Sequence, residues 1–384
     1  MIETMLILAD ENMPLVREAF APLGEVRTVN GRHMQPDEIR DADVLLVRSV
    51  TRIDESLLKH SRVRFVGTAT IGTDHIDTEY LHERGIAMAS APGSNANAVV
   101  DYVLSALCAL DDTLERLNAG GAVGVIGLGN VGSRVVARLQ SLRIDCIGFD
   151  PLLPAQPGLS CASLEELLAA DVVCCHAPLT RDGAFPSLHM LDAAHLQQLR
   201  PGAVLLNAGR GGVIDGSALS RLLQFRDDVH VVLDVWEGEP AIDCDLLARV
   251  TLGTPHIAGY SLDGKIAGTR MMLEACCRHF DVALPAWPEP IIAAPRFTVP
   301  VSLSGNALLR YSITAVYDVR RDDRALREAL AAVAPARIGE RFDALRKNYP
   351  ERREFSASVI ENWCDLTAAN QNLLLQAGFT APFS

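Results

Sequence analysis

The sequence predicts an α/β protein in which two doubly wound parallel-sheet domains precede a smaller C-terminal α+β domain. Two successive series of short apolar runs alternate with polar helical stretches. Longer helical stretches lie near residues 95–118 and 262–280, and a proline-rich segment at 285–300 interrupts the periodicity. Buried parallel strands are almost continuously apolar, and the segments between them must be long enough to cross the sheet. A chain of 384 residues is long enough for two or three such domains.

The first series of apolar runs lies between residues 5 and 92 and predicts one open α/β unit. Its runs are MLILAD, VLLVRS, RFVGTAT and IAMAS. The helical stretch at 95–118 follows, with apolar residues at steps of three and four, which is typical of a helix that buries one face. We expect this helix to connect the first sheet to a second one.

The second series predicts another parallel sheet, with the runs AVGVIGLGNVG, DCIGFD, DVVCCHAPL, AVLLNAGRGG, VHVVLDVW and VTLGTPHIAG. Each run ends in glycine, proline or a polar turn, as strands of an open sheet do. After the helix at 262–280 and the proline-rich linker, residues 300–384 combine helical patterns with a strand candidate at 309–318. This last part predicts the small α+β domain.

Composition limits the partners of the protein. A net charge of -13 argues against binding to nucleic acid or to an anionic membrane surface, since either would need a basic face. The nine cysteines show no CxxC pair and no metal-like spacing to histidine, so we expect free thiols and no metal site. The N-terminus lacks a cleavable leader pattern, and no apolar run is long enough to span a bilayer. These features predict a soluble, cytoplasmic protein.

A glycine-rich turn predicts a dinucleotide site. It follows the run AVGVI, opens a helical stretch, and consists of Gly127, Leu128, Gly129, Asn130, Val131 and Gly132. The first glycine permits a tight turn, the second lets the backbone approach a pyrophosphate, and the third lets helix and strand pack closely. Asp150 ends the next run, where a carboxylate accepts hydrogen bonds from the adenosine ribose. No arginine follows in PLLPAQPG, so NAD is favoured over NADP.

Three polar side chains lie where later runs of the same half end: Arg210, Glu239 and His256. The carboxyl ends of parallel strands converge on one crevice, so these groups can act together. A guanidinium binds the carboxylate of a substrate through two parallel hydrogen bonds, and a histidine removes the proton of its hydroxyl group. A carboxylate of the protein orients that histidine. Each residue alone is more often structural, but the combination after a Rossmann-like turn indicates hydride transfer from a hydroxy acid.

These motifs resemble the D-isomer-specific 2-hydroxyacid dehydrogenase family over about residues 1–282. The resemblance implies that Arg210 orients the substrate, His256 is the acid/base and Glu239 is its partner, with Asp234 beside the nicotinamide. It implies further cofactor contacts from Ala177, Ala208, Gly209 and Gly259. The segments His176–Leu179 and Asn207–Gly211 depart from the common family pattern by losing hydroxyl groups, which should cost about 0.5–1.5 kcal/mol each.

Finer details resemble one subfamily whose substrate is a small phosphorylated 2-hydroxy acid. They are the segments VRSVT and TATIGTDHID, the residues after His256, and a C-terminal region with YDVRRDD and FDALRKNYPERREF. This resemblance implies substrate contacts from Ser49, Thr70 and Tyr260, and a homodimer formed by the C-terminal domain. The substrate phosphate needs cationic partners, for which the candidates are Arg48, Arg52, Arg346, Arg352 and Arg353.

The expected domains follow from these assignments. Residues 1–95 and 256–285 would bind substrate, 96–255 would form a Rossmann NAD-binding domain, and 286–384 would form a dimerisation domain. Two alternatives remain open at this point. One is another dehydrogenase for a phosphorylated substrate, such as 3-phosphoglycerate dehydrogenase, although residues 300–384 lack the βαββαβ rhythm of a regulatory amino-acid-binding domain. The other is an NAD(H)-sensing binding protein, although the chain has no low-complexity extension.

Overall fold

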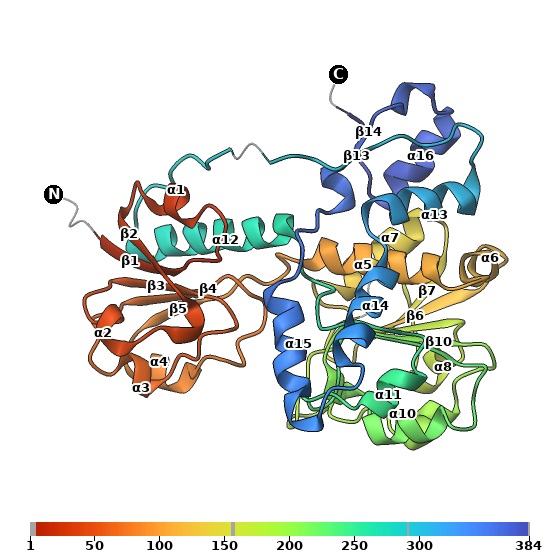
Figure 1. Ribbon diagram of the computed structural model, residues 1–384, viewed down its shortest axis with the longest axis horizontal. Helices are drawn as coiled ribbons and strands as arrows, with labels where there is room; N and C mark the ends of the chain where they lie inside the picture. The colour runs from red at the N-terminus through yellow and green to blue at the C-terminus, as the bar shows by residue number, and fades with distance from the viewer. Residues whose placement is uncertain (1–4, 155–157, 290–291, 383–384) are drawn as a thin grey trace. The chain divides into compact units, whose positions relative to one another are not determined.

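The computed structural model describes residues 5–154, 158–289 and 292–382, and the chain forms two compact units (Figure 1). One unit contains Met1–Asn95 and Ser261–Ala293, and the other contains Ala96–Tyr260 and Ala294–Ser384. The C-terminal residues thus pack in the same unit as the expected NAD-binding domain, and the division into three domains stays a prediction. The first four residues, two residues of the expected linker and part of the segment after Asp150 lie outside the described residues.

The N-terminal unit is built on a five-stranded sheet in which every pairing is parallel. In spatial order its strands are β2 (Gly24–Val29), β1 (Met5–Asp10), β3 (Val44–Val47), β4 (Phe65–Thr68) and β5 (Ala87–Ala89). Its α-helices are α1 (Val16–Phe20), α2 (Pro36–Ile39), α3 (Glu55–Leu58), α4 (Thr78–Glu83) and α12 (Leu262–Phe280). One apolar cluster joins the sheet to α1 and α12, and another joins it to α2, α3 and α4. Helices therefore cover both faces, as predicted for a doubly wound sheet.

The sequence pattern did not predict strand β2. Its sequence GEVRTV alternates in polarity, and its residues are half-buried or exposed, because it is an edge strand beside β1. A rule that looks for continuous apolar runs finds strands buried on both faces and misses such an edge strand.

The second unit contains a seven-stranded sheet, also with parallel pairings throughout. In spatial order its strands are β12 (Leu252–Gly253), β11 (His230–Leu233), β10 (Val204–Asn207), β9 (Val172–Cys175), β6 (Ala122–Ile126), β7 (Asp145–Phe149) and β8 (Ser160–Cys161). Its α-helices up to residue 260 are α5 (Ala96–Ala109), α6 (Thr113–Asn118), α7 (Gly132–Ser141), α8 (Leu164–Leu168), α9 (Ala193–Gln197), α10 (Gly216–Leu222) and α11 (Cys244–Arg249). The six predicted runs are strands in this sheet, and only the short β8 was not predicted.

The predicted helix at 95–118 is two helices. Helix α5 ends at Ala109 and α6 begins at Thr113, with Asp112 in the left-handed region at a φ of 55°. An aspartate tolerates this conformation better than most residues, and the pair Asp111–Asp112 interrupts the apolar spacing. The other predicted long helix, α12, has the predicted bounds.

The C-terminal residues form α13 (Gly305–Val316), α14 (Val319–Leu330), α15 (Ile338–Lys347) and α16 (Ala368–Ala377), with two short parallel strands, β13 (Arg296–Phe297) and β14 (Val359–Ile360). Short 3-10 helices lie at Gly31–His33, Gly211–Val213, Pro335–Arg337, Phe355–Ala357 and Trp363–Asp365. The predicted strand at 309–318 is wrong, because most of it lies in α13. Leu308, Leu309, Ser312 and Ile313 are buried at helical spacing, and α13 packs against α5. Tertiary packing overrode the strand preference of aromatic and β-branched residues.

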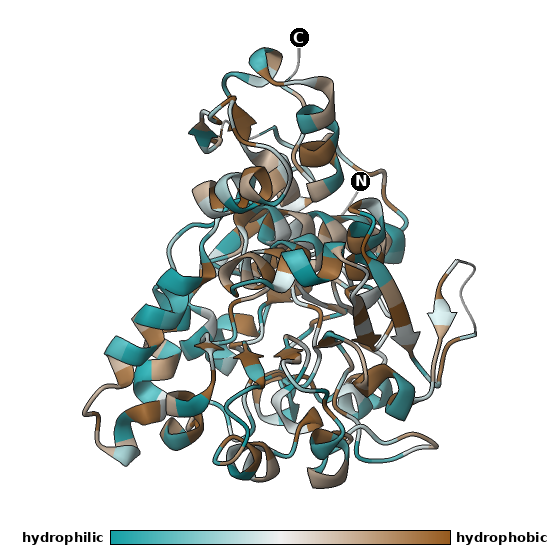
Figure 2. Cartoon of the chain, turned by 90° about the vertical axis from the view of Figure 1, so that its right-hand side faces the viewer, coloured by the Kyte–Doolittle hydropathy of each residue, from teal (hydrophilic) through white to brown (hydrophobic). Residues whose placement is uncertain are grey.

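Hydropathy follows this architecture. Figure 2 shows strands that are largely hydrophobic and helices that carry both hydrophobic and hydrophilic residues, which is the pattern of a sheet covered by amphipathic helices. Among the described residues, no helix is both long and apolar enough to cross a membrane.

Candidate functional site

The glycine-rich turn has the geometry that its sequence predicts. It connects β6 to α7, with Gly127 at a φ of 82° and Gly132 as the first residue of the helix. A Cβ atom on Gly132 would lie 1.9 Å from the carbonyl oxygen of Gly127, so only glycine permits this packing. A Cβ atom on Gly129 would meet nothing within 4 Å. The second glycine therefore borders open space at a helix N-terminus, which fits a pyrophosphate group.

Asp150 is fixed beside this turn. Its Oδ2 accepts a hydrogen bond from the backbone N–H of Leu128 at 2.8 Å, and its Oδ1 accepts one from Leu152 at 3.1 Å. The carboxylate therefore marks the end of β7 next to the glycine turn. Its remaining lone pairs fit ribose hydroxyl groups, and its charge opposes a 2′-phosphate.

The segment of Ala177 borders both Gly127 and Gly209. A Cβ atom on Gly127 would lie 2.7 Å from the backbone nitrogen of Ala177, and one on Gly209 would lie 2.9 Å from the carbonyl oxygen of Ala177. The predicted cofactor residues at the ends of β6, β9 and β10 are thus brought together. Beside them, the two ring nitrogens of His176 are buried without a hydrogen-bond partner in the described part of the chain. Burial lowers the pKa of His176 to about 4, so this imidazole is neutral at physiological pH.

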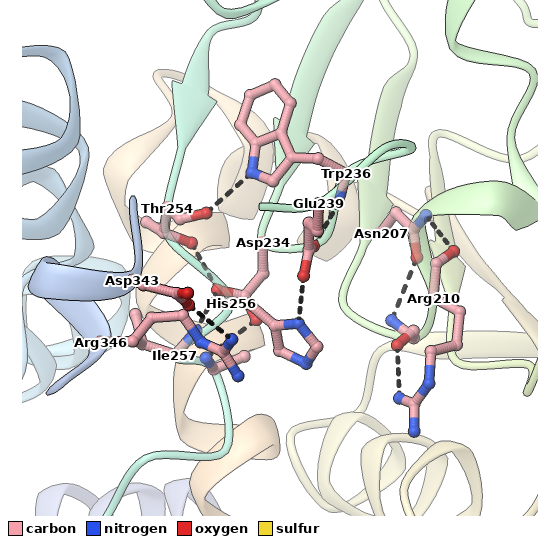
Figure 3. Close-up of polar contacts among 12 residues, drawn as sticks. Asn207, Arg210, Asp234, Trp236, Glu239, Thr254, His256, Ile257, Asp343 and Arg346 are labelled. Atoms are coloured by element: carbon pink, nitrogen blue, oxygen red, sulfur yellow. Dashed lines mark hydrogen bonds and ion pairs between the residues drawn. The ribbon is translucent and has the colours of Figure 1, made fainter. Parts of the chain in front are cut away.

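His256 and Glu239 form a hydrogen-bonded pair (Figure 3). The Nδ1 atom of His256 lies 2.7 Å from Oε2 of Glu239, and the other carboxylate oxygen accepts the backbone N–H of Trp236 at 2.6 Å. Both oxygens of Glu239 are therefore engaged, which fixes the side chain. With Nδ1 directed at the carboxylate, the Nε2 atom is the one that can take a substrate proton.

The backbone around His256 is held by Asp234, at the end of β11. His256 has a φ of 56°, which is unfavourable for a residue with a side chain. Oδ1 of Asp234 accepts the N–H of Ile257 at 2.8 Å and the hydroxyl of Thr254 at 2.7 Å, and Oδ2 accepts the N–H of Ala258 at 2.9 Å. The buried carboxylate thus stabilises the loop that carries His256. A contact of Asp234 with the nicotinamide remains a prediction.

Arg210 lines the same pocket as His256 and Glu239. The pocket, of about 250 Å³, is lined by Arg210, Glu239 and His256 together with Trp236, Gly211 and Leu179. The carbonyl oxygen of Arg210 accepts a hydrogen bond from Nδ2 of Asn207 at 3.0 Å, and its Nη1 donates to the carbonyl of Gly209 at 2.9 Å. The structure therefore brings the three predicted catalytic side chains to one pocket, from loops that follow different strands.

The predicted substrate contacts Ser49, Thr70 and Arg48 belong to the N-terminal unit. Ser49 is exposed beyond β3, and Arg48 is half-buried. The hydroxyl of Thr70 lies 2.7 Å from that of Thr68, which in turn lies 3.1 Å from Nε2 of His75. Burial lowers the pKa of His75. Thr68 and His75 were not predicted as site residues, although both lie in the TATIGTDHID segment.

Tyr260 and the phosphate candidates have different surroundings. The ring of Tyr260 lies edge-on to Tyr349 at 5.9 Å, and the guanidinium of Arg346 lies 5.8 Å from its centroid. Arg52 is highly exposed and pairs with Asp54. Arg352 is buried and donates to backbone carbonyls, which does not fit a phosphate ligand. In the C-terminal cluster, Arg346 thus lies against a predicted substrate residue.

Residues 106–258 match the family described as D-isomer specific 2-hydroxyacid dehydrogenase, NAD binding domain. Residues 290–378 match a second family, a domain of unknown function (DUF3410). The chain is 48% identical to erythronate-4-phosphate dehydrogenase of Cellvibrio japonicus, over 91% of this chain and 93% of that protein. It is 47% identical to the protein of the same name from Pseudomonas putida, over 93% of this chain and 94% of the relative.

A solved structure supports the fold. The TT0316 protein of Thermus thermophilus superimposes with a TM-score of 0.62 at 23% identity, over 75% of this chain and all of that protein. The sequence matches extend over nearly the whole chain and include the C-terminal residues. The chain therefore belongs to the D-isomer specific 2-hydroxyacid dehydrogenase family, and within it to the group of erythronate-4-phosphate dehydrogenases.

Proposed function

We propose that this protein oxidises 4-phospho-D-erythronate to 3-hydroxy-2-oxo-4-phosphooxybutanoate with NAD, a step of pyridoxal phosphate biosynthesis. The observation that carries the proposal is the hydrogen-bonded pair of His256 and Glu239 at the pocket that Arg210 also lines. The names of the relatives supply the substrate, and the matched NAD-binding family supplies the cofactor.

The residues of the pocket divide the chemistry between them. His256 takes the proton of the substrate's C2 hydroxyl through Nε2, and the charge that develops on its ring is stabilised by Glu239 at Nδ1. Arg210 holds the substrate carboxylate in a planar, charge-assisted contact. Bound NAD would accept the C2 hydride. The glycine turn, Asp150 and the segments of Ala177, Ala208 and Gly259 would hold the cofactor.

We assign further substrate contacts to Ser49, Thr70, Arg48 and Tyr260. Arg346 is the favoured ligand of the substrate phosphate, since its Cζ atom lies 5.8 Å from the ring centroid of Tyr260 and its Nη1 atom is 3.6 Å from Oδ1 of Asp343, beyond hydrogen-bond distance. An Arg346→Met variant should raise the KM for 4-phosphoerythronate much more than the KM for NAD. Equal effects on both values would count against this assignment.

We also propose that the enzyme acts in the cytoplasm as a homodimer formed through its C-terminal residues. Each of the nine cysteines, all of which the structure describes, is a free thiol, as expected in a reducing compartment. Light scattering of the purified protein would measure the mass of the particle. A mass near that of one chain, at working concentrations, would contradict the dimer.

The test of the function is the formation of NADH from NAD and 4-phosphoerythronate. Unphosphorylated erythronate and 3-phosphoglycerate serve as comparison substrates. We expect kcat/KM to be greatest for 4-phosphoerythronate. A preference for 3-phosphoglycerate would identify the alternative dehydrogenase, and tight NADH binding without turnover of any of these acids would favour a sensing protein.

A further inference from the structure

The C-terminal residues of the second unit contain a buried arginine that contacts the loop of the reactive histidine. Arg352 lies between α15 and the 3-10 helix at Phe355–Ala357, and 7% of its surface is exposed. Its Nη2 atom donates to the carbonyl of Ala98 at 3.2 Å and, over a shorter distance, to the carbonyl of Ala258. Ala98 belongs to α5, and Ala258 lies two residues after His256.

Neighbouring C-terminal side chains hold the guanidinium in place. Its Cζ atom lies 4.3 Å from the centroid of the Tyr317 ring, a distance at which a cation is attracted to an aromatic face. The hydroxyls of Tyr317 and Tyr349 each donate to Oδ2 of Asp322 at 2.8 Å, and the charge of Asp322 acts on Arg352. A buried cation is stable only with such compensation, and this set of contacts restricts its position.

Both backbone polar groups of Ala258 have hydrogen-bond partners. Its N–H donates to the carboxylate of Asp234, and its carbonyl accepts from Arg352. His256, two residues earlier, has a left-handed φ of 56°, a conformation that costs of order 1–3 kcal/mol unless its surroundings enforce it. Asp234 and Arg352 both hold the backbone at Ala258, two residues after His256.

A second contact joins the C-terminal residues around Arg352 to the loop that follows His256. Tyr349, which donates to Asp322, packs edge-on against Tyr260 at a centroid distance of 5.9 Å. The N–H of Tyr260 donates to the carbonyl of Ile257 at 2.8 Å, which closes the loop into a turn. Residues 257–260 are thus held between β11 and the C-terminal residues.

We propose that Arg352 is a positioning residue for the reaction: through the carbonyl of Ala258 it holds the His256 loop so that Nδ1 meets Glu239 and Nε2 meets the substrate. This inference rests on the proposed function for its kinetic consequence, but its geometric consequence can be measured without any substrate. It also assigns a role to the C-terminal residues within one chain, independent of their role in a dimer.

The test compares Arg352→Lys and Arg352→Ala with the control Arg310→Ala. Arg310 is also a C-terminal arginine that donates to a carbonyl of α5, that of Cys108 at 3.0 Å, but it has no contact with the His256 loop among those described. We expect both Arg352 variants to lose about 10- to 100-fold in kcat, since a displacement of about 1 Å at the reacting group can cost 10²-fold. The KM for NAD should change much less, and Arg310→Ala should lower the melting temperature without lowering kcat more than about twofold.

Two readouts separate positioning from general destabilisation. Added methylguanidinium, below denaturing concentrations, should restore part of the kcat of Arg352→Ala and leave the kcat of Arg310→Ala unchanged. In crystal structures of Arg352→Lys, the distance from Nδ1 of His256 to Oε2 of Glu239 should exceed hydrogen-bond range, whereas it is 2.7 Å here. If Arg352→Ala does not fold, the kcat of Arg352→Lys and its histidine–glutamate distance decide.

An unchanged kcat in folded Arg352→Lys, or an unchanged histidine–glutamate distance, would overturn the inference. Inactivity of the unsubstituted enzyme toward 4-phosphoerythronate would instead overturn the proposed function. In that case the crystallographic distance alone would decide whether Arg352 positions the loop.

Discussion

Replacement of Glu239 by glutamine tests the His256–Glu239 pair most sharply, because the change removes one charge and keeps the size of the side chain. In the native protein Oε1 accepts the N–H of Trp236 at 2.6 Å, and Oε2 faces Nδ1 of His256 at 2.7 Å. A glutamine offers one oxygen and one amide nitrogen. If the oxygen stays on Trp236, the amide N–H₂ faces Nδ1, and the histidine must place its proton on Nε2 to accept from it.

That tautomer cannot take a proton from the substrate through Nε2. If the amide rotates, Nδ1 keeps an acceptor but the N–H of Trp236 loses one, and the neutral oxygen no longer stabilises a charged ring. Loss of a hydrogen bond to a charged group costs about 1.5–3 kcal/mol, which corresponds to roughly 10- to 150-fold in rate. Trapping of the wrong tautomer would raise the loss toward about 10⁴-fold.

The assay is the initial rate of NADH formation at saturating NAD and substrate. We expect Glu239→Gln to lower kcat by at least about tenfold, with a smaller change in the KM for NAD. The matched control is Asp192→Asn, since Asp192 lies 2.8 Å from Nδ1 of His195 in a surface pair on α9. A loss of less than about threefold in Glu239→Gln, or an equal loss in Asp192→Asn, would refute the reasoning.

Three further predictions follow from the cofactor half of the protein. Asp150→Asn should raise the KM for NAD and reduce the preference for NAD over NADP by about tenfold, since the negative charge that opposes a 2′-phosphate is removed. The preference is measured as the ratio of the two kcat/KM values, and an unchanged ratio would contradict the role of Asp150. Gly132→Ala should lower the melting temperature, because its Cβ would overlap the carbonyl of Gly127, whereas Gly129→Ala should leave melting unchanged and weaken NAD binding in calorimetry; the reverse order would contradict the assigned roles. Burial lowers the pKa of His176 from 6.5 to about 4, so between these pH values the unfolded chain binds a proton that the folded chain does not. The free energy of unfolding should therefore decrease as the pH falls from 6.5 to 4, by at most about 3 kcal/mol. Urea unfolding of His176→Gln should show a smaller dependence on pH over that range, and an equal dependence would count against the burial of a neutral imidazole.

Most strands of the two sheets could be predicted because they are buried on both faces and therefore appear as continuous apolar runs. Helix α12 could be predicted to its bounds, since its N-cap, Ser261, and its apolar spacing are both local signals. Strand β2 and helix α13 could not. The first is a half-exposed edge strand, and the second has aromatic and β-branched residues whose helical conformation depends on packing against α5.

The candidate site divides in the same way. Arg210, Glu239 and His256 could be named from the sequence because strand ends of a parallel sheet converge, and the structure places them at one pocket. The residues that hold the His256 loop in place could not be predicted from the sequence. It depends on a left-handed backbone at His256, on backbone N–H groups directed at Asp234, and on an arginine nearly 100 residues away in sequence. The sequence suggested Arg352 as a phosphate ligand, but burial against Tyr317 gives it a different role.

The central claim is that the imidazole of His256 accepts the substrate's proton while NAD accepts its hydride. The most direct measurement is the single-turnover rate of NADH formation from 4-phosphoerythronate by the native protein and by His256→Asn, each saturated with NAD. The account predicts rapid NADH formation by the native protein and a loss of about 10²- to 10⁴-fold in the variant. A near-native rate in a folded His256→Asn protein would contradict it.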